Sequence, residues 1–156
     1  MNFLKNKIIL ITGGTGTFGK EVTKFILENI KVKKLIILSR DENKQYEMSK
    51  KYPNNKLIRF FIGDIRDKNR LMTAFRGVDY VIHAAAMKHV PASEYNPIEC
   101  IKTNVDGSES VINAAIERKV KKVIALSTDK ACNPVNLYGA TKPVSYTHLT
   151  LPTMFE

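Results

Sequence analysis

The 156-residue sequence lacks the features that mark membrane, disulfide-rich and metal-binding proteins. No apolar run approaches the roughly 18 residues that a membrane-spanning helix needs. The N-terminus enters a strand-like segment directly, so we expect no cleavable leader and a cytoplasmic protein that makes no membrane contact. Only two cysteines are present, Cys100 and Cys132, and neither lies in a CxxC pair or near a histidine at ligand spacing. We therefore expect neither a disulfide framework nor a metal site.

Internal repeats, low-complexity segments and interdomain linkers are also absent. The composition, 44% hydrophobic and 26% charged, is that of one globular domain with a real hydrophobic core. The formal net charge of +10 could indicate a nucleic-acid partner. The lysines are scattered, however, and pairs such as Lys33-Lys34 directly precede apolar runs. We interpret most of them as solvated surface and expect a phosphate-bearing small ligand rather than DNA or RNA.

Short apolar runs alternate with segments of helical spacing. Continuous runs rich in Ile, Val and Leu are typical of strands buried on both faces of a parallel sheet. The expected strands are Lys7–Thr12, Lys34–Ser39, Lys56–Ile62, Tyr80–Ala84 and Lys122–Ser127, and the expected helices are Phe18–Ile30, Asp41–Lys51, Asp67–Phe75 and Ile98–Arg118. This alternation predicts an α/β fold, a Rossmann-type doubly wound parallel sheet in the order 3-2-1-4-5. Ligand is then expected at the carboxyl ends of the strands.

A glycine-rich segment from Gly13 to Gly19 directly follows the first expected strand. It fits GxGxxG when counted from Gly14 and GxxGxxG when counted from Gly13. Glycines there permit a tight turn, backbone approach to a pyrophosphate and close packing of the next helix, whose N–H groups face the phosphates. The strand before and the helix after favour a dinucleotide site over a plain glycine turn. The expected cofactor-binding residues are Gly13, Gly16, Thr17, Phe18 and Gly19.

The end of the second expected strand distinguishes NADP from NAD. An Asp or Glu there would bind the ribose hydroxyls of NAD, but the chain has Ser39-Arg40, with Asp41 one position late. A small residue followed by an arginine suits a 2′-phosphate, since the guanidinium pairs with it bidentately. We expect NADP, with Ser39, Arg40 and Lys44 at this end of the site. NAD is the alternative if Arg40 is only a solvated loop residue.

Two further strand ends fit the same cleft. Gly63-Asp64-Ile65 follows the third strand, where the Asp64 carboxylate could accept a hydrogen bond from the adenine amino group. Ala84-Ala85-Ala86 follows the fourth strand, and small side chains there let a flat cofactor lie against the backbone. Simple core packing is the alternative reading of the alanines. These strand ends add Asp64, Ile65, Ala84 and Ala85 to the expected cofactor site.

The fifth strand is followed by Ser127-Thr128-Asp129-Lys130 and then by Tyr138 and Lys142. A tyrosine and a lysine four residues apart on a helix lie on one face. The nearby ammonium group of Lys142 can stabilise a phenolate at Tyr138. Tyr138 could then act as a general base that takes a hydroxyl proton as hydride leaves the same carbon. A YxxxK pair alone is common by chance, but behind a glycine loop and five alternating strands it is specific.

At these residues the sequence resembles the extended short-chain dehydrogenase/reductases. Within them it is similar to the inverting UDP-N-acetylglucosamine 4,6-dehydratases that open the pseudaminic acid pathway. The resemblance covers residues 5–142 without a gap. The matching stretches are Ser39–Glu42, Phe60–Asp64, Ala84–Pro91, Glu99–Asn104, Ser127–Lys130 and Asn136–Lys142.

The resemblance implies a role for each residue of the catalytic group. Tyr138 would be the base for oxidation at sugar carbon 4, with Lys142 as its electrostatic partner and Thr128 bonded to the reacting oxygen. Lys130 would remove the carbon 5 proton, and Asp129 would protonate the departing carbon 6 hydroxyl before hydride returns to carbon 6.

The resemblance also adds residues to the cofactor side of the site. Asn104 corresponds to a helix asparagine that supports the active site, and Lys88 to a lysine on the cofactor side. Tyr138 and Lys142 are expected to contact the cofactor as well as the substrate.

Other functions remain open at this point. Asp129-Lys130 could be a surface ion pair, and the same scaffold serves nucleotide-sugar epimerases and reductases, which usually lack such a pair. A non-catalytic NADP-binding module is a further alternative, although it would not need Tyr138. Membrane-anchored relatives usually have methionine where Tyr138 stands. We therefore expect a UDP-N-acetylglucosamine dehydratase of bacterial surface or flagellar glycan synthesis, homo-oligomeric at full length.

The last residues do not fit this pattern. Pro143 and Pro152 are poor helix residues, and the segment from Val144 onward carries no Lys or Arg. Residues 143–153 resemble the translation of a transposase adapter used in sequencing libraries. We expect residues 1–142 to be the NAD(P)-binding Rossmann domain of an incomplete, inactive enzyme, truncated before its substrate-binding region. Residues 143–156 are expected to be non-native, with the helix that carries Tyr138 cut short after Lys142 and with His148 uninvolved in catalysis.

Overall fold

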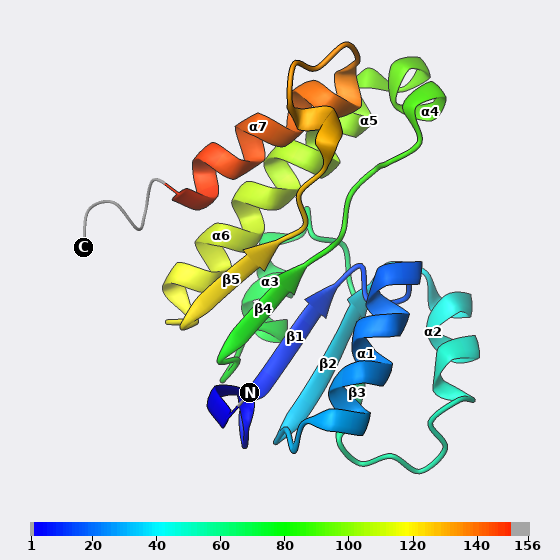
Figure 1. Cartoon of the computed structure of the whole chain (residues 1–156), viewed down its shortest axis with the longest axis vertical. Coiled ribbons are helices and arrows are strands. Elements are labelled where there is room, and N and C mark those ends of the chain that lie inside the picture. Colours follow the sequence, from blue (N-terminus) through cyan, green and yellow to red (C-terminus); the bar gives the residue numbers. More distant parts are fainter. Residues whose placement is uncertain (1, 151–156) are drawn as a thin grey trace.

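A parallel sheet forms the centre of the computed structural model, which describes residues 2–150 (Figure 1). Its strands are β1 (Ile8–Thr12), β2 (Lys34–Ser39), β3 (Ile58–Ile62), β4 (Tyr80–His83) and β5 (Lys122–Ala125). All neighbouring pairs are parallel, in the order β3-β2-β1-β4-β5, so the predicted Rossmann-type topology is confirmed. The direction of winding reverses between β1 and β4, and ligands of such sheets bind at this reversal.

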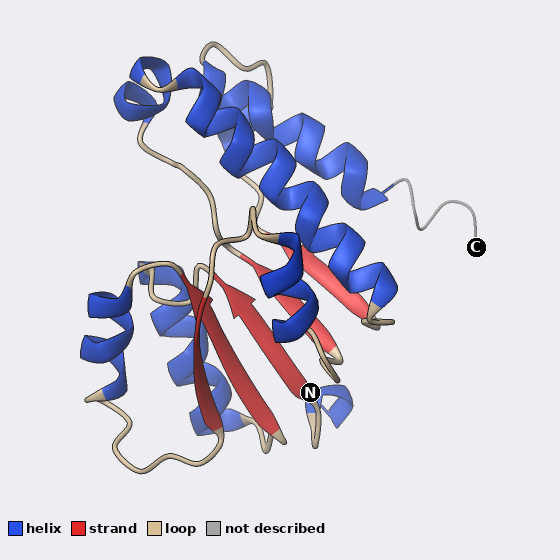
Figure 2. Cartoon of the chain, turned by 180° about the vertical axis from the view of Figure 1, so that it is seen from behind, coloured by secondary structure: helices blue, strands red, loops and turns tan. Residues whose placement is uncertain are grey.

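Helices cover both faces of the sheet (Figure 2). They are α1 (Thr17–Asn29), α2 (Glu42–Ser49), α3 (Lys68–Ala74), α4 (Val90–Tyr95), α5 (Pro97–Ile101), α6 (Gly107–Glu117) and α7 (Leu137–Thr150), with short 3-10 turns at Asn2–Leu4 and Asp129–Ala131. Asp41 and Asp67 begin α2 and α3, because each carboxylate accepts a hydrogen bond from the N–H three residues later, at 2.9 Å. Within the described chain, none of the helices has the length and hydrophobicity that crossing a membrane requires.

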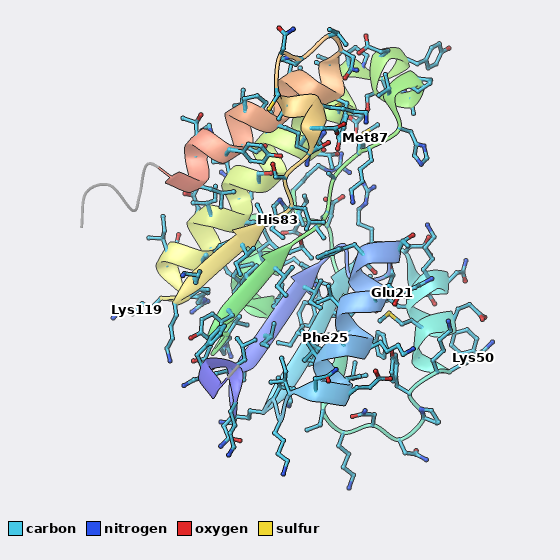
Figure 3. The ribbon with its side chains drawn as sticks, viewed as in Figure 1. Glu21, Phe25, Lys50, His83, Met87 and Lys119 are labelled. Carbon is cyan, nitrogen blue, oxygen red and sulfur yellow. The ribbon has the colours of Figure 1, made fainter. Side chains whose placement is uncertain are left out.

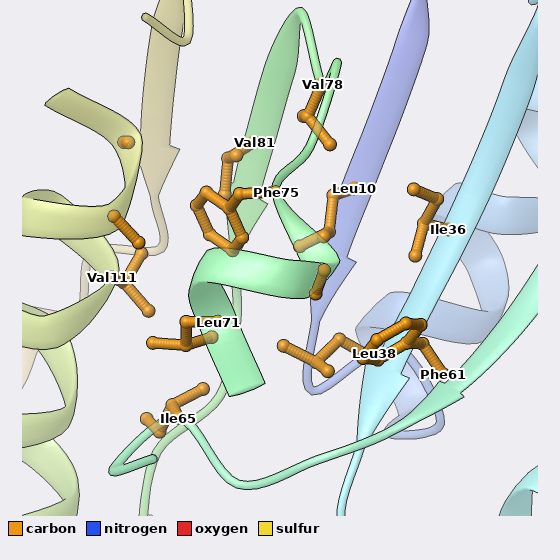
Figure 4. Close-up of a cluster of buried hydrophobic side chains, with 13 residues drawn as sticks. Leu10, Ile36, Leu38, Phe61, Ile65, Leu71, Phe75, Val78, Val81 and Val111 are labelled. Carbon is orange, nitrogen blue, oxygen red and sulfur yellow. The ribbon is translucent and has the colours of Figure 1, made fainter. Parts of the chain in front are cut away.

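The central strands bury side chains on both faces. Ile9 and Ile11 of β1 pack with the residues of α1 and α2, whereas Leu10 between them faces the opposite core. In that second core, Leu71 and Phe75 lie against Leu10 and are fully buried (Figure 4). Because alternate side chains of one strand enter two different cores, the strands are apolar at nearly every position.

The long predicted helix Ile98–Arg118 is interrupted. A π-helical turn, Lys102–Asp106, joins α5 to α6, and Thr103 and Asn104 are buried in it. The Asn104 side chain bonds there to the backbone of Met87, outside the helix, and such widened turns are frequent at functional sites. Helix α4 was not predicted, because Val90–Tyr95 has too few residues to show a helical period.

The expectation that the Tyr138 helix ends after Lys142 is wrong, because α7 continues through Pro143 to Thr150. Pro143 has no N–H to offer to the carbonyl four residues earlier, so one helical hydrogen bond is lost. Contacts beyond it hold the helix in place: Ser145 donates to the Asn104 carbonyl at 2.5 Å, and the Tyr146 hydroxyl donates to the Leu126 carbonyl at 3.4 Å. The non-native origin of residues 143–156 stays a prediction, and Leu151–Glu156 lie outside the described residues.

The packing of the second core predicts that shortening one side chain of α3 strongly destabilises the protein. Leu71→Ala is expected to lower the free energy of unfolding by about 2–5 kcal/mol, because it leaves a cavity between α3 and the sheet. Urea unfolding measures the change, and Asn69→Ala on the exposed face of α3 serves as the control, expected within about 0.5 kcal/mol of the parent. Equal losses in the two variants would contradict this assignment of the core.

Candidate functional site

The glycine loop brings the end of β1 against the segment that follows β4. Gly13 has a φ of +65°, and a Cβ added to it would lie 2.8 Å from the Cα of Ala85. The N–H of Gly14 donates to the Leu38 carbonyl at the end of β2, at 3.3 Å. Helix α1 starts directly after this loop, and no side chain caps its N-terminus. Its first N–H groups and its positive dipole end are therefore available to an anion in the cleft.

A cleft of about 940 Å³ lies along this loop at the carboxyl ends of the strands. Most predicted cofactor-binding residues line it: Gly13, Gly16, Thr17, Phe18, Gly19, Ser39, Arg40, Lys44, Ile65, Ala84, Ala85 and Lys88. Asp64, Asn104, Tyr138 and Lys142 were predicted for the same site but are not among its lining residues. Thr15, Gly63 and Ala86 also line it, and they belong to the segments that were predicted to form the site. Lining residues that the sequence did not reveal are Leu38, Asp41, Met87, His89, Ala92 and Thr103.

The missed residues differ in whether the sequence could have revealed them. Met87 and His89 follow the alanine triplet after β4, so their place at a strand end was a usable signal. Ala92 and Thr103 lie on α4 and on the π-helical turn, and no local pattern marks them. Only the folding of these helices back over the strand ends places them beside the cleft.

Ser39 is held in place by a buried glutamine at the β2 end of the cleft. Gln45, on α2, donates through Nε2 to the Ser39 hydroxyl at 3.0 Å, to the Ser39 carbonyl at 3.2 Å and to the Phe61 carbonyl at 3.0 Å. The Ser39 oxygen accepts from Gln45, so its own proton remains available for a ligand oxygen. The sequence analysis did not single out Gln45.

The guanidinium of Arg40 lies at the same end and pairs with Asp64 at 3.5 Å. The Asp64 carboxylate is held more tightly by Arg66, whose Nη2 and Nε donate to it at 2.8 and 3.0 Å. Partial burial would raise the pKa of Asp64, but the hydrogen bonds from Arg66 outweigh it and hold this pKa below its usual range. Asp64 is therefore ionised and bonded to two arginines, and its predicted contact with adenine stays a prediction.

Asn104 connects the cleft wall to α7. Its Oδ1 accepts from the Met87 N–H at 2.8 Å, and its Nδ2 donates to the Met87 carbonyl at 3.1 Å and to the Thr141 hydroxyl at 3.0 Å. The Thr141 hydroxyl donates in turn to the Tyr138 carbonyl at 2.8 Å. Asn104 thus holds Met87 and Thr141 from behind the cleft and does not line it. Its predicted support of an active site stays a prediction.

The predicted catalytic residues lie together where the 3-10 turn Asp129–Ala131 meets the start of α7. Gly139 permits this contact, because a Cβ there would collide with the Lys130 carbonyl. Tyr138 is buried, and the Lys142 ammonium lies 5.7 Å from the centre of its ring. Burial, and after it the positive charge of Lys88, lowers the pKa of Lys142 to about 8. Lys142 therefore lies near the Lys88 side of the cleft.

Asp129 and Lys130 form an exposed pair on the 3-10 turn, with 3.7 Å between the ammonium and the carboxylate. A hydrogen bond from the Thr128 hydroxyl and then the charge of Lys130 lower the pKa of Asp129. A proton donor needs the opposite shift, so in this geometry Asp129 is an anion. The structure brings Thr128, Asp129 and Lys130 to the start of α7, but their predicted roles stay predictions.

His83 is a buried histidine that the sequence analysis did not assign. Its Nδ1 lies 2.7 Å from the Thr12 hydroxyl, and its Nε2 lies 3.1 Å from the Ser108 hydroxyl. Burial, followed by the charges of Lys142 and Lys88, lowers the pKa of His83 to about 4. The ring is therefore neutral near pH 7. Across residues 2–150, no three His, Cys, Asp or Glu side chains are grouped so that they could hold a metal ion.

A model of the polysaccharide biosynthesis protein family matches residues 9–151. The chain is 68% identical over 139 residues to a UDP-N-acetylglucosamine 4,6-dehydratase (inverting) from Campylobacter jejuni, which covers 89% of this chain and 41% of the relative. It is 51% identical over 140 residues to a UDP-glucose 4-epimerase from Rickettsia prowazekii, which covers 88% of this chain and 41% of the relative. The chain thus spans about two fifths of the length of these relatives.

Solved structures share the fold. The X-ray structure of Pen from Bacillus thuringiensis superposes with a TM-score of 0.92 at 44% identity, over 96% of this chain and 47% of that one. A double mutant of the dTDP-glucose 4,6-dehydratase DesIV from Streptomyces venezuelae, with NAD bound, gives a TM-score of 0.80 at 25% identity, over 90% of this chain and 49% of that one. The resemblance to nucleotide-sugar enzymes of the short-chain dehydrogenase type is confirmed.

The neutral state of His83 predicts a stability loss in acid. Above the ordinary pKa of 6.5 the ring is neutral whether the chain is folded or unfolded, so its contribution is constant. Between pH 6.5 and about 4 only the unfolded chain takes up the proton, which lowers the free energy of unfolding by about 3 kcal/mol at roughly 1.4 kcal/mol per pKa unit. Urea unfolding from pH 7.5 to 4 measures this slope.

Two histidine variants isolate the effect from the carboxylates that titrate in the same range. His83→Gln is expected to be less stable at pH 7 but to lose less stability in acid than the parent. His148→Gln, at the exposed end of α7, is expected to follow the parent curve. If His83→Gln ran parallel to the parent from pH 7.5 to 4, His83 would not be the group responsible.

Proposed function

Because the chain belongs to the polysaccharide biosynthesis protein family, we propose that it is the nucleotide-binding part of an inverting UDP-N-acetylglucosamine 4,6-dehydratase. One observation carries the proposal: the hydrogen bonds of Asn104 and Thr141 join Met87, which lines the glycine-loop cleft, to the Tyr138 carbonyl. Thr128, Asp129, Lys130, Tyr138 and Lys142 lie together there, at the start of α7. An acid and an amine beside a tyrosine-lysine pair match what dehydration of a sugar requires. The 68% identity to the Campylobacter dehydratase supports the same choice.

The residues of the cleft fit a nicotinamide dinucleotide. An uncapped helix N-terminus suits the pyrophosphate, and the small side chains of Ala84 and Ala85 line the cleft where a flat group would bind. We propose NADP because Arg40, Lys44 and the free Ser39 proton lie together at the β2 end, where a 2′-phosphate would bind. Such a cofactor, when bound, supplies a hydride acceptor for the oxidation step.

The chain's own residues would then divide the proton transfers. Tyr138 takes the proton of the carbon 4 hydroxyl, the charge of Lys142 stabilises the phenolate, and Thr128 bonds the reacting oxygen. The resulting ketone acidifies the neighbouring carbon 5 proton, which Lys130 removes. Asp129 protonates the carbon 6 hydroxyl as it leaves as water. Covering of Asp129 by the bound sugar would remove water and favour the protonated carboxyl that this step needs. The hydride removed from carbon 4 would then return to carbon 6, and a proton to carbon 5, which gives the 4-keto-6-deoxy product.

The cellular role follows from the substrate. We propose a cytoplasmic enzyme that acts on UDP-N-acetylglucosamine, homo-oligomeric at full length, in bacterial surface or flagellar glycan synthesis of the pseudaminic acid type. The family description supports a role in polysaccharide synthesis.

A UDP-glucose 4-epimerase is the second candidate, because the chain is 51% identical to one from Rickettsia prowazekii over 140 residues. An epimerase also needs a tyrosine base and a nicotinamide cofactor, so the cleft and Tyr138 do not separate the two functions. Asp129 and Lys130 do, since epimerisation at carbon 4 removes no carbon 5 proton and expels no hydroxyl.

NADP preference is tested directly by calorimetry on the 156-residue chain. NADP is expected to bind more tightly than NAD, and Arg40→Ala is expected to weaken NADP by about 1.5–3 kcal/mol, the range of a charge-assisted hydrogen bond, while NAD changes little. Arg76→Ala, on an exposed arginine outside the cleft lining, is the matched control. Equal affinity for the two cofactors would contradict the assignment of Arg40.

The dehydratase reaction is tested in a chimera that joins residues 1–142 to the part of the Campylobacter relative that they do not match. The chimera is expected to convert UDP-N-acetylglucosamine to a 4-keto-6-deoxy product. Tyr138→Phe should block oxidation itself. Lys130→Ala should spare reversible oxidation and abolish both elimination and deuterium uptake at carbon 5. NMR and mass spectrometry of the product follow each step.

Three outcomes of the chimera assay would count against parts of the proposal. Product at the normal rate in Lys130→Ala would show that another group removes the carbon 5 proton. A carbon 4 epimer in place of the ketone would favour the epimerase. The 156-residue chain is assayed in parallel and is expected to give no product, because catalysis depends on holding the sugar within about 3–3.5 Å of the reacting groups. Turnover by this chain would contradict its predicted inactivity.

A further inference from the structure

We propose that His83 is a positioning residue that fixes the floor of the cleft relative to the helix carrying Tyr138, and that it does so through one tautomer, with the proton on Nε2. His83 ends β4 and lies between the glycine-loop strand and α6 (Figure 3). The coupling to cofactor binding rests on the proposed function, because NADP is the ligand used to detect it. The tautomer and the hydrogen-bond chain do not depend on that function.

The contact between Thr12 and His83 shows which nitrogen of the ring is the acceptor. The Thr12 hydroxyl oxygen accepts from the N–H groups of Ala84 at 3.2 Å and Ala85 at 3.3 Å, and both groups can only donate. A hydroxyl has two acceptor positions and one proton, so the proton is left for the 2.7 Å contact with His83 Nδ1. Nδ1 is therefore the acceptor, and the ring proton lies on Nε2.

The Ser108 side gives the same answer independently. The Ser108 hydroxyl donates its proton to the Asn104 carbonyl at 2.7 Å, and a carbonyl can only accept. In the 3.1 Å contact with His83 the Ser108 oxygen must then accept, so Nε2 is the donor. An imidazole carries a donor and an acceptor at opposite edges of one rigid ring, which is the combination that these two contacts require.

From Ser108 the series of hydrogen bonds continues to both walls of the cleft. Asn104, whose carbonyl receives the Ser108 proton, holds the backbone of Met87 with its side chain and continues through Thr141 to the Tyr138 carbonyl. At the other end, Thr12 bonds the N–H of Ala85, whose backbone faces Gly13. One line of buried hydrogen bonds thus joins the glycine-loop side of the cleft to the helix of the proposed base.

The position of these hydrogen bonds predicts which half of a bound dinucleotide loses affinity when they are broken. Ala85 and Met87 line the cleft near Lys88, whereas Ser39, Arg40 and Lys44 line it at the β2 end. A cofactor whose 2′-phosphate binds at Arg40 would place its nicotinamide half toward Ala85 and Met87. Loss of the His83 contacts should therefore weaken NADP and leave a ligand that lacks the nicotinamide half unaffected.

Two serines on α6 provide a matched pair of variants. Ser108 and Ser110 are equally buried, and each donates to the carbonyl four residues earlier, at 2.7 and 2.8 Å. Only Ser108 contacts His83. Calorimetry with NADP and with adenosine 2′,5′-bisphosphate is expected to show NADP about fivefold weaker in Ser108→Ala, a typical coupling free energy, with the bisphosphate unchanged. Ser110→Ala should match the parent for both ligands.

Nitrogen NMR of the imidazole in the unmodified chain tests the tautomer without any variant. The His83 signals, identified by their absence in His83→Gln, are expected to show a protonated Nε2 and a bare Nδ1 from pH 6 to 8. A proton on Nδ1, or an imidazolium in this range, would overturn the assignment, as would equal effects of Ser108→Ala and Ser110→Ala on NADP. If the unmodified chain bound no NADP, the proposed cofactor would be wrong. The imidazole signals and the Met87 and Thr141 amide shifts in Ser108→Ala would then still decide the role of His83.

Discussion

The close approach of two backbones, at Gly13 after β1 and at Ala85 after β4, is the constraint on which the site depends. The two strands lie side by side at the point where the winding of the sheet reverses, and a single added methyl group on Gly13 would fill the gap between them. The N-terminus of α1 is left open to the cleft, and the chain after β4 lines the cleft before it enters α4. The glycine loop and the cleft wall after β4 meet at this one contact.

Within residues 2–150, the titratable groups in the interior are not held in ion pairs. His83 is neutral near pH 7, and the pKa of Lys142 is lowered to about 8, since both groups are buried and both experience the charge of Lys88. Carboxylates pair with arginines near the surface, in the line from Arg40 through Asp64 and Arg66 to Glu99. A neutral interior costs less desolvation free energy than an ionic one and keeps the hydrogen-bond directions fixed.

Local patterns in the sequence predict the strands, their order and most of the cleft, because each of these depends on residues close together in the chain. Alternating burial on β1 and β2 makes continuous apolar runs, and Gly13 to Gly19 marks the loop between a strand and a helix. The supporting contacts could not be predicted in this way. Asn104 meets Met87 and Thr141 across separations of 17 and 37 residues, and Gln45 reaches Phe61 across 16.

Helix α7 is a second case in which the local sequence does not determine the structure. Pro143 is a strong local signal against a helix, yet Ser145 and Tyr146 reach Asn104 and Leu126, which are distant in the sequence, and these contacts outweigh it. Local propensity is a weak guide wherever tertiary contacts are available to override it.

Gly139 determines how far apart the two proposed proton acceptors, Lys130 and Tyr138, can lie. The turn that carries Lys130 rests against the backbone of the helix that carries Tyr138, in the space that the missing side chain of Gly139 leaves. In a lineage of such enzymes, a change at this position would alter the timing of two successive proton transfers without touching either acid-base group. An alanine there would push the turn away from the helix, and in the proposed enzyme the amine that acts second would then stand farther from the tyrosine that acts first.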